Sequence, residues 1–171
     1  MRCGDSIPCP QETRMTPVAP VLPVVLDTNV VLDLYVFEDP ALRELHQALK
    51  EGRLVAWAED ATLAELGYVL ASRNFLPGRA QDARGTALAR YREHARVLPA
   101  GEGSAALELP RCRDRDDQKF LDLAARAGAS WLVSKDKRVL SMADRHGMPF
   151  LILTPRQAVA RLAAQALEAG R

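Results

Sequence analysis

Short apolar runs alternate with longer amphipathic stretches along most of the chain. The runs are continuous rather than alternating, which is typical of strands buried on both faces of a parallel sheet. The stretches between them carry apolar residues at helical spacing, as at Leu63, Leu66 and Leu70. The pattern therefore predicts an α/β fold, a three-layer α/β/α sandwich with a central parallel sheet. The predicted strands are residues 24–26, 53–58, 131–134 and 150–153.

The helical segments are marked by punctuating residues. Asp39 is predicted as an N-cap, Pro40 as the first helical residue and Gly52 as the exit. Gly128 is expected to end the helix of residues 116–127. The other helices are expected from about residue 29, over 60–75, 77–96 and 155–167, and in a short turn after residue 136, with 98–110 a loop containing a short extended piece.

Composition divides the chain into a leader and one domain. Residues 1–20 contain four prolines and no periodicity, so we expect a disordered leader followed by a single domain over 21–168. The apolar run at 18–26 is far shorter than the ~20 residues that span a bilayer, and it lacks a signal-peptide cleavage site. The three cysteines follow no zinc or disulfide spacing, which favours reduced thiols in a cytoplasmic protein: Cys3, Cys9 and Cys112.

The charge of the whole chain is close to neutral, at +1, so any binding of nucleic acid must come from a local patch. Between residues 71 and 100 there are six arginines and two acids. A second basic group flanks Asp136 and consists of Lys135, Lys137 and Arg138. Both groups are candidates for following a nucleic-acid backbone, although Arg-rich helical faces are usually just solvated.

Two acids lie at the carboxyl ends of predicted strands, where parallel sheets place their ligands. Asp27 directly follows the first strand, and a carboxylate buried there is costly unless it is paired or binds a cation. Asp136 follows the third strand and is also a suitable N-cap for the next helix. Glu65 is a third candidate, but Thr62 and Glu65 also have the spacing of a capping box.

The tract RDRDDQKFLDLA, residues 113–124, is rich in aspartate. If a helix begins near Asp116, then Asp117 lies one turn before Phe120 and Leu121 and shares their buried face. Asp114 becomes the expected N-cap. The opposite, solvated side is expected to carry Asp116, Lys119, Asp122 and Arg126, the last two as an i,i+4 pair.

Carboxylates that converge without histidine or cysteine partners suit hard divalent cations, Mg²⁺ or Mn²⁺. Two such ions about 4 Å apart can activate water and stabilise the leaving oxygen of a phosphodiester. Other chemistries lack support, since the glycines of 101–106 are not followed by the Lys-Ser/Thr of a phosphate loop. The histidines match neither a metal motif nor a catalytic triad: His46, His94 and His146.

Four segments in order, VVLDTNV, TLAELGYVL, RDRDDQKFLDLA and WLVSKD, carry a family resemblance over residues 24–162. The chain resembles a PIN domain, of the kind found as VapC-like toxins of bacterial toxin–antitoxin pairs. The resemblance implies a metal-dependent ribonuclease that acts on RNA, binds Mg²⁺ or Mn²⁺, forms a homodimer and is blocked by a small antitoxin. The acids it implies as catalytic and metal-binding are Asp27, Glu65, Asp117 and Asp136.

The resemblance also assigns supporting positions. Asn29 and Ser134 match polar residues that flank the family's site. Asp114 is the alternative to Asp117 as the acid that this tract contributes to the site. Close relatives often have Asp-Pro-Asp-Asp in the acidic tract, where this chain has Arg115 in place of the proline. For Glu65, the resemblance favours a role in the site over the capping box.

Two alternative functions remain open. A phosphatase of the haloacid dehalogenase type also has an aspartate at the end of its first strand, but its general acid two residues later would here be Asn29. A non-catalytic module that binds nucleic acid or a partner protein is the other alternative. Binding alone does not require clustered carboxylates, which favours the nuclease.

Overall fold

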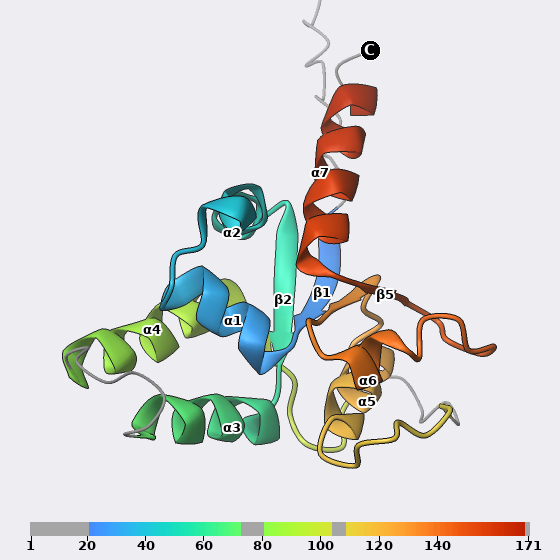
Figure 1. Ribbon diagram of the computed structural model, residues 1–171, viewed down its shortest axis with the longest axis horizontal. Coiled ribbons are helices and arrows are strands. Elements are labelled where there is room, and N and C mark those ends of the chain that lie inside the picture. The colour runs from blue at the N-terminus through green and yellow to red at the C-terminus, as the bar shows by residue number, and fades with distance from the viewer. Residues whose placement is uncertain (1–20, 73–80, 104–108, 170–171) are drawn as a thin grey trace, which may run out of the picture.

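The computed structural model describes residues 21–72, 81–103 and 109–169 (Figure 1). Five strands form one parallel sheet in the order β3-β2-β1-β4-β5, so the predicted sheet is confirmed. The strands are β1 (Leu22–Leu26), β2 (Leu54–Ala58), β3 (Ala95–Val97), β4 (Trp131–Val133) and β5 (Leu151–Leu153).

Helices cover both faces of the sheet and complete the expected three layers (Figure 1). One face carries α1 (Thr28–Tyr35), the 3₁₀ turn η1 (Pro40–Leu42), α2 (Arg43–Lys50), α3 (Asp60–Ala71), α4 (Gln81–His94) and α7 (Pro155–Ala169). The other carries α5 (Gln118–Arg126) and α6 (Lys137–Leu140). The buried apolar side chains form two clusters, one on each side of the sheet.

The strand order creates a switch point beside β1. The chain leaves β1 toward β2 on one side and later returns to place β4 on the other. At the carboxyl end of this pair, Leu26 is in register with Val133, and the Asp27 amide donates to the Val133 carbonyl at 3.0 Å. Residues that follow β1 and β4 are therefore held side by side, which is where ligands bind in such sheets.

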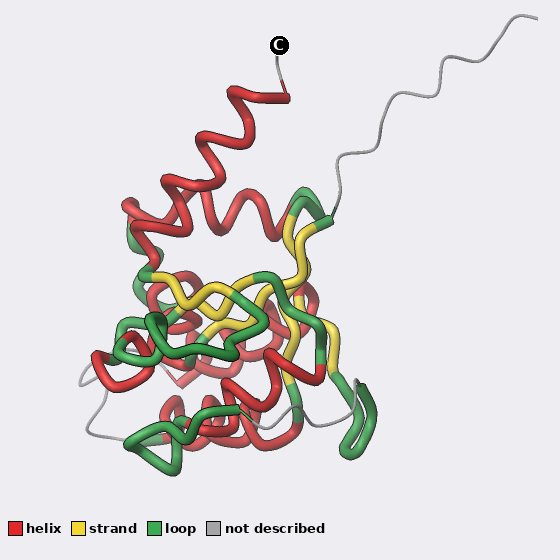
Figure 2. The backbone as a smooth tube through the Cα atoms, turned by 90° about the vertical axis from the view of Figure 1, so that its right-hand side faces the viewer, coloured by secondary structure: helices red, strands yellow, loops and turns green. Residues whose placement is uncertain are grey.

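Several boundaries differ from the prediction, among them the helix expected over 60–75, which ends at Ala71. Residues 95–97 form the edge strand β3 instead of the end of a helix. Because an edge strand pairs on one side only, here with β2, its residues need not be apolar, and the apolar pattern did not predict it. Helix α5 begins at Gln118, two residues later than expected. Helix α7 runs to Ala169 and extends beyond the rest of the fold (Figure 2). The expected leader at 1–20 and the helix start at 77 lie outside the described residues.

No helix among the described residues is both long and apolar enough to cross a bilayer.

Gly103 is required by both backbone conformation and space. Its φ is +109°, and a Cβ there would lie 2.4 Å from the Arg126 carbonyl oxygen. We expect Gly103→Ala to lower the free energy of unfolding by more than about 1 kcal/mol, measured by urea denaturation. Gly67→Ala is the control, because Gly67 lies within α3 and a Cβ added there would meet nothing within 4 Å, so it should raise stability by about 0.5–1 kcal/mol. Equal losses in both variants would contradict this requirement for glycine.

Candidate active site

Asp27 lies at the switch point and is almost completely buried, with 4% of its surface exposed. It is the first residue after β1 and the N-cap of α1, so the strand and the helix together fix its position. The Ser134 hydroxyl donates to its Oδ2 at 2.6 Å. Burial raises the pKa of Asp27, Glu65 and Asp136 raise it further, and the Ser134 hydroxyl and the Asn29 backbone amide oppose the shift.

Ser134 connects Asp27 to Asp136. The side chain of Ser134 is completely buried at the end of β4, and its Oγ accepts a hydrogen bond from the Asp136 amide at 3.0 Å. Asp136 is the N-cap of α6, as predicted, and its Oδ1 accepts from the Arg138 amide at 2.6 Å. Ser134 therefore orients two groups, the Asp27 carboxylate at the end of β1 and the Asp136 backbone amide after β4.

Glu65 is not part of a capping box. The N-cap of α3 is Glu59, and Thr62 is the N3 residue whose hydroxyl accepts from the Glu59 amide at 3.0 Å. The capping box from Thr62 to Glu65, the alternative to a role in the site, is thus wrong, because the N-cap of α3 lies one turn before Thr62. The Glu65 side chain instead accepts from Thr28 Oγ1 at 2.7 Å and forms an ion pair with Lys119.

The acidic tract divides mostly as the helical phase predicts. Asp117 is partly buried at the N-cap of α5 and lies near the other acids. Burial raises its pKa to about 6, helped in decreasing order by Asp136, Asp114, Asp27 and Glu65. Asp116 and Asp122 are exposed.

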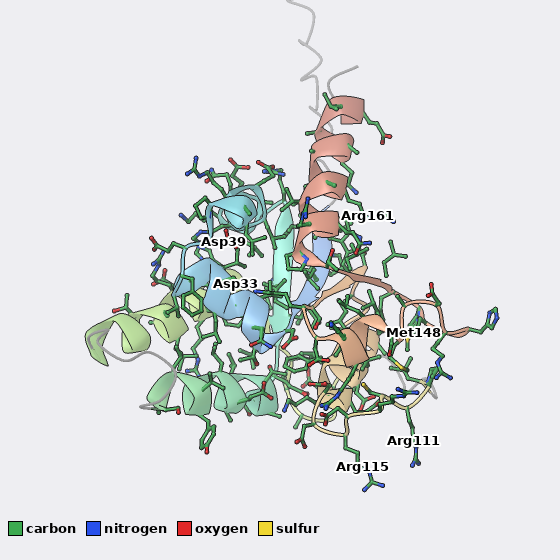
Figure 3. All side chains as sticks on the ribbon, in the orientation of Figure 1. Asp33, Asp39, Arg111, Arg115, Met148 and Arg161 are labelled. Carbon is green, nitrogen blue, oxygen red and sulfur yellow. The ribbon has the colours of Figure 1, made fainter. Side chains whose placement is uncertain are left out.

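Three expectations within the tract are wrong. Asp114 does not cap α5; its Oδ1 accepts from the Asp116 amide at 3.0 Å, two residues on, and its other oxygen pairs with Arg138. Arg126 pairs with Glu59 rather than Asp122, because it points across to α3. Lys119 faces Glu65 rather than solvent. Arg111 and Arg115 are exposed and point away from the body of the protein (Figure 3).

The oxygens of the four carboxylates are the kind of ligand that a hard divalent cation prefers. Glu65 and Asp136 raise the pKa of Asp27 and Asp117, so the four carboxylates lie close enough to repel one another. As the side chains stand, no three acidic, histidine or cysteine groups in the described part of the chain are arranged to hold one ion. The reason is visible in the contacts. Oxygens of Asp27 and Asp136 accept hydrogen bonds from protein groups, and Glu65 is held by a hydroxyl and an ammonium.

A pocket of about 620 Å³ opens beside Asp136. Its wall includes the exposed Asn29 and the basic residues that follow β4. One of these, Lys135, pairs with Asp33 at 2.7 Å, while Lys137 and Arg138 lie at the start of α6. Of the Arg-rich segment at 71–100, Arg73, Arg79 and the Arg84 side chain lie outside the described residues. Neither the pocket nor the contacts of Thr28 could be predicted from the sequence. The only signal for Thr28 was its position next to Asp27.

We expect Ser134→Ala to reduce stability by about 1 kcal/mol, because the Asp27 carboxylate and the Asp136 amide each lose a buried partner. The change is measured by thermal and urea unfolding. Ser141→Ala is the control, since its exposed hydroxyl donates only to the Arg138 carbonyl at 2.7 Å. A loss for Ser134→Ala no larger than for Ser141→Ala would show that Ser134 does not organise the strand ends.

Comparisons with known proteins agree with this architecture. The chain is similar in fold to the protein PAE2754 of Pyrobaculum aerophilum, with a TM-score of 0.57 and 19% identity, over 85% of this chain and 92% of that one. It is also similar to VapBC2 of Rickettsia felis, solved with a DNA fragment of its promoter, with a TM-score of 0.52 and 15% identity, over 78% and 98% of the two chains. None of the curated proteins matches the sequence.

Residues 23–138 match the PIN domain family, and this stretch contains all four acids. The chain therefore belongs to the PIN domain family. PIN domains are generally nucleases, and their nucleases generally use divalent metal ions.

Proposed function

We propose that this protein is a metal-dependent endoribonuclease with Asp27, Asp117 and Asp136 at the centre of its active site. The observation that carries the proposal is the convergence of these acids at the switch point, where burial and then neighbouring acids raise the pKa of Asp27 and Asp117. Glu65 and Asn29 complete the surroundings of the site, and the basic pocket beside Asp136 offers room for a phosphate backbone.

A bound Mg²⁺ or Mn²⁺ would polarise the phosphoryl oxygen and lower the pKa of an attacking water. Asp27, Asp117 and Asp136 are the residues that would hold it, because their charges are not neutralised by ion pairs among the described residues. Ser134 orients Asp27 by donating to its Oδ2, and this hydrogen bond opposes the rise that burial causes in the pKa of Asp27. Lys137 and Arg138 place positive charge along the pocket, where they would bind the backbone on either side of the scissile bond.

We further propose that the nuclease is the toxin of a toxin–antitoxin pair and acts in the cytoplasm. The support is the likeness in fold to VapBC2 of Rickettsia felis together with membership of the PIN domain family. The partners proposed are RNA as substrate, a small antitoxin that blocks the site, and a second copy of the chain in a homodimer. Co-expression with the product of a neighbouring short reading frame should restore growth if the nuclease alone arrests it.

The function is tested by incubating the purified protein with single-stranded RNA, and separately with DNA, in Mg²⁺, Mn²⁺ or EDTA. We expect RNA to be cut internally with either ion and to stay intact in EDTA. Asp116→Asn and Asp122→Asn should cut at the wild-type rate, because both side chains are exposed on the solvent side of α5.

Other outcomes point to the alternatives. Intact RNA together with no metal binding in calorimetry would favour a non-catalytic binding module on the same fold. A covalent aspartyl phosphate on Asp27 would favour the phosphatase. Cleavage of DNA with RNA left intact would contradict the choice of substrate but not the nuclease.

A further inference from the structure

Lys119 contributes a positive charge to the acid cluster. It is the second residue of α5 and forms an ion pair with Glu65 of α3, so it links two helices on opposite faces of the sheet. Both side chains are partly buried, with 26% and 30% of their surfaces exposed. Of the ion pairs within the described residues, this is the one that includes any of the four acids.

Glu65 is held at both of its oxygens. Oε1 accepts from the hydroxyl of Thr28, which is buried next to Asp27, and Oε2 faces the Lys119 ammonium. A metal ion that used Glu65 as a ligand would have to displace one of these partners. The ammonium is the harder one to displace, because it carries a full positive charge opposite the carboxylate, whereas the Thr28 hydroxyl is neutral.

Two other cations near the cluster have different partners. Arg138 pairs with Asp114, outside the four acids, and Lys135 pairs with Asp33 of α1. The charge of Lys119 thus compensates that of Glu65. A bound cation would then be coordinated by the other three acids, Asp27, Asp117 and Asp136. Three carboxylates are enough for one octahedral ion that keeps several waters.

We propose that Lys119 is a positioning residue that withholds Glu65 from the metal, so that the site binds one divalent cation and uses the ammonium as its second positive charge. The proposal rests on the proposed nuclease function and specifies how that site is built. Removing Lys119 would leave an uncompensated, partly buried carboxylate near Asp27, and a further cation bound there would compensate this costly charge.

The test is calorimetric titration of the metal-free protein with Mn²⁺ alone, with no RNA present. We expect wild type and Lys119→Arg to bind about one ion per chain, because arginine keeps the positive charge. Lys119→Met should bind about two, or bind Mn²⁺ about tenfold more tightly. Lys50→Met is the matched control, because it removes an exposed lysine at the end of α2, outside the site, and should leave the stoichiometry unchanged.

A second comparison does not depend on the folding of Lys119→Met. Glu65→Gln should leave the Mn²⁺ affinity within about threefold of wild type, whereas Asp117→Asn should lower it by more than about thirtyfold. The proposal is overturned if wild type binds two ions, or if Glu65→Gln weakens binding as much as Asp117→Asn. Absence of any Mn²⁺ binding by wild type would instead overturn the proposed metal-dependent function. Binding of two ions together with RNA cleavage would leave that function intact.

Discussion

Asp27→Asn should reduce metal-dependent RNA cleavage by about 10³-fold or more while leaving the protein folded. The carboxylate is fixed by β1, α1 and the Ser134 hydroxyl, so no neighbouring acid can take its place. Loss of a metal ligand removes several kcal/mol of transition-state stabilisation, and each ~1.4 kcal/mol corresponds to a factor of ten.

Stability should not fall with it, because asparagine has the same shape and its oxygen still accepts from Ser134. The substitution also removes a buried charge whose burial raises the pKa of Asp27. Initial cleavage rates and thermal midpoints are measured side by side for Asp27→Asn and for Asp122→Asn, the exposed control. A rate within about tenfold of wild type would place the metal elsewhere.

Much of this site follows from the sequence because strand ends are simple to locate. Continuous apolar runs marked β1 and β4, and a parallel sheet brings their carboxyl ends together. Asp27 and Asp136 are therefore expected side by side without any knowledge of side-chain contacts. Helical phase likewise directs Asp117 inward and Asp116 outward, even though α5 begins two residues later than predicted.

The contacts around Glu65 did not follow, because they depend on neighbours distant in the sequence. The Thr-x-x-Glu pattern of Thr62 and Glu65 favoured a capping box with threonine as the N-cap. In the observed box the glutamate, Glu59, is the N-cap and the threonine, Thr62, is the N3 residue. Helical phase predicts the direction in which the Lys119 side chain leaves α5. It does not predict how far this long side chain reaches, which here is as far as Glu65 of α3. Edge strand β3 carried no apolar signal either, since Arg96 and Val97 are exposed.

Asp117→Asn should make the metal-free protein more stable and abolish its response to metal. The pKa of Asp117 is raised from 3.8 to about 6, so between these values the folded state holds a proton that the unfolded state has released. The free energy of unfolding therefore falls as pH rises through this window, and the penalty is complete above about pH 6. Since the side chain is only partly buried, solvent screening reduces the penalty to about 1 kcal/mol.

At about pH 7.5 without metal, Asp117→Asn should thus unfold about 2–4 °C above wild type, and the difference should vanish below about pH 4. Saturating Mn²⁺ should reverse the order, because an ion at 100 times its Kd stabilises wild type by about 2.7 kcal/mol and the variant has lost a ligand. Asp116→Asn, which neutralises the neighbouring exposed acid, should follow wild type in both conditions. A lower midpoint for Asp117→Asn without metal would show that burial and the other acids do not destabilise the ionised Asp117. An undiminished rise with Mn²⁺ would show that Asp117 does not bind the ion. Differential scanning fluorimetry across this pH range, with EDTA or Mn²⁺, separates the two effects, because burial and repulsion of the ionised Asp117 act in the empty site and coordination acts in the loaded one.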